Sequence, residues 1–115
     1  MEKEELKKQF KTRIYQYVLR LIKFLVRLPN DPVLKEMKSQ LTRSGTSVGA
    51  NYQNFFLISL KSANESKFWL SVLKNTGLVP NNLGNESCWL LQETGELANI
   101  FASSILTMKG KTRCF

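Results

Sequence analysis

The residues best suited to chemistry in this chain are cations that recur between residues 13 and 27. Arg13, Arg20 and Arg27 stand seven residues apart, so on a helix they form one row, with Lys23 beside it. A guanidinium group can bind a phosphate through two hydrogen bonds and can stack on an exposed base. The row therefore predicts a nucleic-acid-binding surface. The competing interpretation is a solvated polar face, or pairing of the arginines with glutamates of a neighbouring helix.

The sequence offers no catalytic constellation. Histidine is absent, which removes the commonest general base and the commonest zinc ligand. Glu93 and Glu96 stand at helical neighbour spacing, but they lack the Glu-x-x-His pattern of di-iron bundles. These two glutamates are the expected partners if the arginines pair within the protein. We therefore expect no enzymatic activity, no metal and no cofactor.

The charge balance of the chain favours an anionic partner. Its 115 residues include 17 Lys and Arg against 9 Asp and Glu, which gives a formal net charge of +8. RNA or DNA comes first among such partners, and a membrane surface second. No secretory signal pattern is found, and the apolar stretch 17–28 is too short and too charged to span a bilayer. We expect a cytoplasmic protein in which Cys88 and Cys114 are reduced thiols.

Small residues dominate the run from Arg43 to Gln53, which reads RSGTSVGANYQ. Leu34, Met37 and Leu41 lead into the run at helical spacing, so we interpret it as part of a helix. Small side chains let a neighbouring helix approach closely. A phosphate-binding loop is the alternative, although the run lacks the Gly-Lys-Ser/Thr ending of a P-loop. The predicted helix-packing motif consists of Arg43, Ser44, Gly45, Ser47, Gly49, Ala50, Asn51 and Tyr52.

Apolar periodicity predicts four helices, at about residues 3–28, 32–52, 55–76 and 85–109. Pro29 and Pro32 end the first helix, and Asp31 is suited to cap the second. We expect one all-α domain over residues 1–109, followed by a basic tail at 110–115. The core of the third helix is expected to come from Ile58, Trp69, Val72 and Leu73.

The second half of the first helix has an unusually wide apolar arc. Val18, Leu19, Ile22 and Val26 adjoin the expected core stripe, so a helix serving one core would expose them. A contact between subunits would bury this arc, and we predict that the four residues form an oligomer interface. Binding to a membrane surface is the competing explanation, because a basic strip opposite a broad apolar face also suits an interfacial helix.

Three motifs carry a resemblance to a known family. They are QLTRSGTSVGANY from Gln40 to Tyr52, Phe68-Trp-Leu70, and Asn75-x-Gly-Leu78. The chain resembles, from about residue 10 to about residue 109, the bacterial family of proteins encoded by intervening sequences in 23S ribosomal RNA genes. That family also includes the accessory variability determinant of diversity-generating retroelements. The resemblance implies an antiparallel up-down four-helix bundle, often a pentamer, without enzymatic activity and with nucleic-acid binding inferred for several members.

The chain departs from the family pattern at one place. Family members have a longer segment, rich in Arg, Ala and Ser, after the Ala-Asn-Tyr end of the small-residue run. Here Gln53 is followed directly by Asn54 and an apolar stretch. Either the hairpin between the second and third helices is shortened, or the sequence omits residues. Two functions are consistent with these observations: a homo-oligomeric bundle that binds structured RNA or DNA, and a protein–protein interaction module or accessory subunit without direct nucleic-acid contact.

Overall fold

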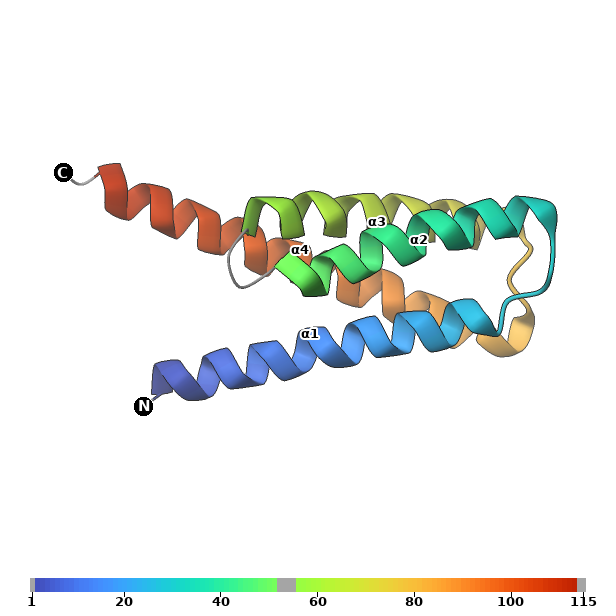
Figure 1. The fold of residues 1–115 in the computed structure, drawn as a ribbon, viewed down its shortest axis with the longest axis horizontal. Helices are drawn as coiled ribbons and strands as arrows, with labels where there is room; N and C mark the ends of the chain where they lie inside the picture. The colour runs from blue at the N-terminus through green and yellow to red at the C-terminus, as the bar shows by residue number, and fades with distance from the viewer. Residues whose placement is uncertain (1, 52–55, 114–115) are drawn as a thin grey trace.

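Four α-helices make up the fold. The computed structural model describes residues 2–51 and 56–113, and the side chains of these residues up to 107. The helices are α1 (Glu2–Val26), α2 (Pro32–Asn51), α3 (Phe56–Thr76) and α4 (Gly84–Arg113), and a 3-10 turn at Asn81–Leu83 precedes α4. Successive helices run in opposite directions and pack against their neighbours in the order α1, α2, α3, α4, with α4 returning to α1 (Figure 1). The predicted all-α, up-down four-helix bundle is confirmed.

Two polar contacts close the turn between α1 and α2, and the sequence predicted the first of them. Asp31 caps α2 because its Oδ1 accepts hydrogen bonds from the backbone N–H groups of Val33, at 2.9 Å, and Leu34, at 3.2 Å. Lys38 Nζ donates to the carbonyl oxygen of Leu28 at 3.0 Å, which satisfies a backbone acceptor just past the end of α1. These contacts fix how the first helix leads into the second.

The helices of the second hairpin are the shorter pair. α2 and α3 have 20 and 21 residues, whereas α1 and α4 have 25 and 30. The first turns of α1 and the last turns of α4 therefore extend beyond the hairpin (Figure 1), and α4 continues past the expected end at residue 109. Leu6 and Leu106, on these extensions, are exposed. The Gln53–Asn54 junction lies outside the described residues.

The side of α2 that faces α1 is built around two glycines. A methyl carbon placed on Gly45 would overlap Cδ2 of Leu21, which is itself fully buried. A methyl carbon on Gly49 would lie 3.0 Å from Cγ2 of Val18 and 3.7 Å from Cγ2 of Ile14. The large side chains of α1 thus occupy the space that the glycines leave open.

The side of α2 that faces α3 is lined by hydroxyl groups. Ser66 of α3 donates to Ser44 at 2.8 Å, and Ser62 donates to Ser47 at 2.7 Å. Ser59 donates to the carbonyl oxygen of Val48 at 3.2 Å. These serines have small side chains and satisfied hydroxyl groups, so the two helices approach closely without leaving a buried polar atom unpaired.

The remaining members of the predicted packing motif lie at its edges. Arg43 donates to Glu65 on α3, and Ala50 is exposed. Asn51 donates from Nδ2 to the backbone oxygen of Ser47 at 3.0 Å, within α2. Tyr52 lies outside the described residues.

The core contributed by α3 differs from the expectation. Ile58 is 44% exposed, so its assignment to the core was wrong, and Trp69 and Val72 are only partly buried. Leu73 is fully buried, as expected. The close approach of α2 leaves room only for small side chains along most of the inner side of α3. The buried residues of α3 are Ser59, Ser62, Ala63, Ser66, Leu70 and Leu73.

Candidate nucleic-acid interface

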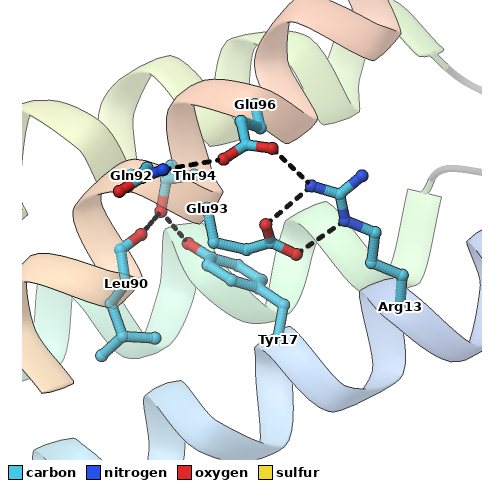
Figure 2. A network of polar contacts seen from close by, with 7 residues as sticks. All are labelled: Arg13, Tyr17, Leu90, Gln92, Glu93, Thr94 and Glu96. Carbon is cyan, nitrogen blue, oxygen red and sulfur yellow. Dashed lines mark hydrogen bonds and ion pairs between the residues drawn. The ribbon is translucent and has the colours of Figure 1, made fainter.

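Arg13, the first member of the predicted row, is held by glutamates of α4. Its Nε donates to Oε2 of Glu93 at 2.8 Å, and its Nη2 donates to Oε1 of the same carboxylate at 2.7 Å (Figure 2). Nη2 also lies 3.1 Å from Oε1 of Glu96. Such a two-point contact is the strong form of an Arg–carboxylate pair. Arg13 therefore serves the alternative role that the sequence offered, pairing between helices.

The Arg13 pair belongs to a larger polar network between α1 and α4. Glu93 is buried, and its hydrogen bonds to Arg13 are the main cause that raises the pKa of the guanidinium. Beside it, Tyr17 forms a hydrogen bond of 2.6 Å with Thr94, whose hydroxyl donates to the carbonyl oxygen of Leu90 (Figure 2). Burial raises the pKa of Tyr17 to about 12, so the phenol stays neutral at physiological pH. The network joins α1 to α4, with Tyr17, Glu93 and Thr94 buried and Arg13 at its outer edge.

Arg20 is also engaged by α4. Its Nε donates to Oε2 of Glu86 at 3.0 Å, and its Nη2 contacts the other carboxylate oxygen. Hydrogen bonding from Arg20 is the largest cause that lowers the pKa of Glu86. The guanidinium carbon also lies 3.4 Å from the ring centre of Trp89, which adds a cation–π contact. Arg20 thus spans two side chains of α4 and has little capacity left for a phosphate.

Lys23 and Arg27 have the opposite character. Both side chains are exposed, and neither lies within ion-pair distance of an acidic group among the described residues. The charge of Arg27 is near enough to Glu86 to help lower the pKa of that carboxyl, after the larger effect of Arg20. Lys23 lies in the last turn of α1, and Arg27 follows the last helical residue, Val26, at the turn that leads to α2. The neighbouring residues Asn30, Asp31, Pro32, Lys35 and Lys38 line a shallow depression there.

Neutralisation of charge within the protein is uneven. Four glutamates form ion pairs with arginines: Glu65, Glu86, Glu93 and Glu96. Those arginines are three of the 17 basic residues, so most of the positive charge is carried by side chains outside these ion pairs. Among the four residues of the predicted row, the unpaired charge is concentrated at Lys23 and Arg27, at the α1–α2 end of the bundle.

The residues of the predicted oligomer interface separate into two groups. Val18 faces α2 and packs on Gly49, so part of its surface is already used within the chain. Leu19 is partly buried, whereas Ile22 and Val26 are 38% and 77% exposed. Sequence reasoning missed Tyr15, which is 65% exposed on the same side of α1. The intervals of four, three and four residues from Tyr15 to Leu19, Ile22 and Val26 could have shown that Tyr15 lies on this side of the helix.

The described residues show neither a metal-binding cluster nor a membrane-spanning helix. Within residues 2–51 and 56–113, no group of three or more His, Cys, Asp or Glu side chains could hold a metal ion. None of the described helices is long and apolar enough to cross a membrane. Cys88 is exposed and unpaired by any disulfide.

Comparisons with known proteins give one informative match. No protein-family model matches the chain, and no curated protein matches it. Among solved structures, the chain is similar to the crystal structure of a protein of unknown function from the S23 ribosomal protein family of Bacteroides thetaiotaomicron. The two chains are 28% identical and superpose with a TM-score of 0.68, over 83% of this chain and 96% of the other. The match confirms the family resemblance found in the sequence: this chain is similar in sequence and in fold to the S23 family, the 23S rRNA intervening-sequence proteins.

Proposed function

We propose that the protein is a non-enzymatic, homo-oligomeric bundle that binds structured RNA or DNA through a basic surface at its α1–α2 end. The observation that supports this proposal is the uneven neutralisation of the arginine row. Arg13 and Arg20 are held by glutamates of α4, whereas Lys23 and Arg27 keep exposed, unpaired charges. Lys35 adds a further exposed charge at the start of α2. Contacts with phosphates release counterions, and repetition of the surface in an oligomer adds their effects together.

Binding of a labelled RNA hairpin and a DNA duplex, measured by fluorescence anisotropy at several salt concentrations, tests the proposal. We expect the affinity to fall steeply as salt rises, because released counterions are favourable only at low salt. The double variant Lys23→Glu/Arg27→Glu should lose affinity by about tenfold or more and should flatten the salt dependence. Lys8→Glu/Lys11→Glu is the matched control, since it changes the net charge equally on the far half of α1.

The control double variant should bind within about threefold of the unmodified protein if the surface lies where we propose. Equal losses in both variants would mean that the attraction is diffuse and that no particular surface is involved. Absence of binding even at low salt would contradict the proposal for nucleic acid altogether.

A protein–protein interaction module is the second candidate. It is favoured by the pairing of Arg13 and Arg20, which reduces the basic row, and by exposed apolar residues such as Phe68, which is 58% exposed. Capture from the native host with the tagged chain separates the two candidates. A partner that survives nuclease treatment, together with no nucleic-acid affinity in the anisotropy assay, would support the second candidate.

A further inference from the structure

A shallow depression with a volume of about 530 Å³ lies where α3 packs on α4. One border is formed by α3 and the other by α4, through Lys67, Lys74, Cys88, Gln92 and Asn99. We call it the α3–α4 depression. The connection from α3 to α4 lies at the same end of the bundle as the turn from α1 to α2 (Figure 1). The depression therefore begins near the end that carries Lys23 and Arg27, and a large ligand at that end can reach it.

A glycine forms part of the α4 side of the depression. Cys88, Gln92, Gly95 and Asn99 follow one another at intervals of four, three and four residues, so they share one side of the helix. A methyl carbon on Gly95 would have no atom within 4 Å, so packing within the chain does not require a glycine there. A glycine inside a helix costs about 1 kcal/mol relative to alanine. Close approach of a ligand to the helix backbone is a use that only this residue type allows.

The α3 side of the depression supplies positive charge. Lys67 and Lys74 are exposed and stand seven residues apart, which is about 10 Å along one side of a helix. Neither lysine lies within ion-pair distance of an acidic group among the described residues. An ammonium group binds phosphate as a point charge. The two lysines can therefore bind different phosphates of one strand.

Glu96 also lines the depression, but its charge is already offset. Its Oε1 accepts a hydrogen bond from Nη2 of Arg13 at 3.1 Å, and its Oε2 accepts one from Nε2 of Gln92 at 3.3 Å. The carboxylate is thus directed to partners within the protein. The depression keeps a positive balance from the two lysines.

The polar groups of the depression suit a sugar–phosphate backbone better than bases. Among the described residues that line it, there is no aromatic side chain on which a base could stack. Gln92 and Asn99 are exposed amides, and an amide has both hydrogen-bond donors and an acceptor. The 2′-hydroxyl of RNA is likewise a donor and an acceptor, and proteins that bind RNA helices contact it together with the phosphates. DNA lacks this hydroxyl.

We propose that the α3–α4 depression binds the ribose–phosphate backbone of an RNA helix. Lys67 and Lys74 contact phosphates, Gln92 and Asn99 contact 2′-hydroxyl groups, and Gly95 lets the strand approach α4. The inference rests on the nucleic-acid binding that we propose above. It adds a second contact surface and a preference for RNA over DNA.

Fluorescence anisotropy with an RNA hairpin and a DNA hairpin of the same sequence tests the preference. The RNA should bind about fivefold more tightly or better, because only RNA offers the 2′-hydroxyl groups. Gln92→Met/Asn99→Leu removes the amides at similar side-chain size, so it should abolish this preference and leave the affinity for DNA unchanged. Equal affinity of the unmodified chain for the two hairpins would overturn the recognition of the 2′-hydroxyl groups.

Filling the depression tests its position without disturbing the fold. Gly95→Leu adds a side chain in open space and improves helix propensity, so the melting temperature should not fall. Its affinity for the RNA hairpin should nevertheless fall about tenfold, because the strand can no longer approach α4. Ala50→Leu is the control, since it adds a large side chain at an exposed position of α2, outside the depression. It should bind RNA like the unmodified chain.

Cys88 provides a local probe of occupancy. The chain has two cysteines, so Cys114→Ser leaves Cys88, which is exposed, as the reactive thiol. A saturating amount of the RNA hairpin should slow its alkylation by N-ethylmaleimide about fivefold or more, because access controls the reaction. Lys67→Glu/Lys74→Glu, added to Cys114→Ser, should lose this protection at the same RNA concentration.

The outcomes separate this inference from the proposed function. If RNA binds but Cys88 reacts at its free rate and Gly95→Leu binds normally, the depression is excluded and the surface at Lys23 and Arg27 stands. If poly-glutamate protects Cys88 as well as RNA does, the depression recognises acidic chains in general and the inference is wrong. Absence of RNA binding at low salt would contradict both the inference and the proposed function.

Discussion

The two sides of α2 reach close packing by different chemistry. Toward α1, Gly45 and Gly49 supply empty space that Leu21 and Val18 fill. Toward α3, serine hydroxyls pair across the contact, as between Ser44 and Ser66. The first contact depends on shape alone, and the second depends on both shape and hydrogen bonding. One short run of small residues can therefore serve two neighbours, provided that glycines and serines fall on alternate sides of the helix.

The glycine side should be the more sensitive to added volume. Gly45→Leu inserts a side chain where even a methyl group would overlap the buried Leu21. We expect a loss of about 3 kcal/mol or more in the free energy of unfolding, because α1 and α2 must move apart. Urea denaturation followed by circular dichroism measures this loss. A value below about 1 kcal/mol would show that α1 can move away at little cost.

The serine side should be sensitive to loss of a hydrogen-bond partner. Ser44→Ala or Ser66→Ala alone should cost about 1–2 kcal/mol, since each leaves a buried hydroxyl group without this partner. The double variant should cost about as much as the larger single change, because both hydroxyls are then removed. A double-mutant cycle from denaturation curves measures the coupling. Strictly additive losses would mean that the Ser44–Ser66 bond contributes nothing.

A smaller effect distinguishes the two packed glycines from a glycine with open space around it. Gly95, in α4, has no atom within 4 Å of an added methyl carbon, so Gly95→Ala should stabilise the protein by about 0.5–1 kcal/mol through helix propensity. Gly49→Ala gains the same propensity but places its methyl carbon 3.0 Å from Val18. We expect it to be less stable than Gly95→Ala. Equal stabilisation in thermal unfolding would show that Val18 yields freely.

The smallest effect is expected at the exposed border of the serine side. Arg43 pairs with Glu65, but the Arg43 side chain is 58% exposed. Arg43→Gln should therefore cost less than about 1 kcal/mol, and the difference should shrink at high salt. Unfolding measured at two salt concentrations provides the check. A larger loss that is independent of salt would assign Arg43 a packing role.

The sequence predicted the parts of the fold that depend on local pattern. The turn at residues 29–32 and the cap at Asp31 follow from proline and aspartate chemistry. Helical spacing also predicted that the small-residue run belongs to the second helix, although the composition of the run is typical of a loop. The inner side of α3 could not be found in this way, because the usual rule assigns large apolar residues to the core. There, the distance between the backbones of α2 and α3 determines which side chains fit, and sequence periodicity does not report that distance.

For the arginine row, the sequence predicted two alternatives: a nucleic-acid-binding surface, or a polar face whose arginines pair with glutamates of a neighbouring helix. Helical spacing placed Arg13, Arg20 and Arg27 in one row, but it could not show which of them α4 would reach. That depends on the relative position of two helices far apart in the chain. The outer side of α3 was missed for a related reason, since spacing alone assigned Ile58 and Trp69 to the core, whereas Ile58 is exposed and Trp69 is only partly buried.

The ion pairs between α1 and α4 also determine how these two helices align. Arg13 meets Glu93 and Arg20 meets Glu86, so a step of seven residues along α1 matches an equal step backward along α4. Sliding α4 by seven residues in one direction would place Arg13 opposite Glu86 and would leave Arg20 beyond the first residue of the helix, Gly84. Sliding it the other way would bring Arg13 to Ile100. Each slip breaks both observed pairs and gives only one arginine a new glutamate partner, so these charges select a single register even where their contribution to stability is small.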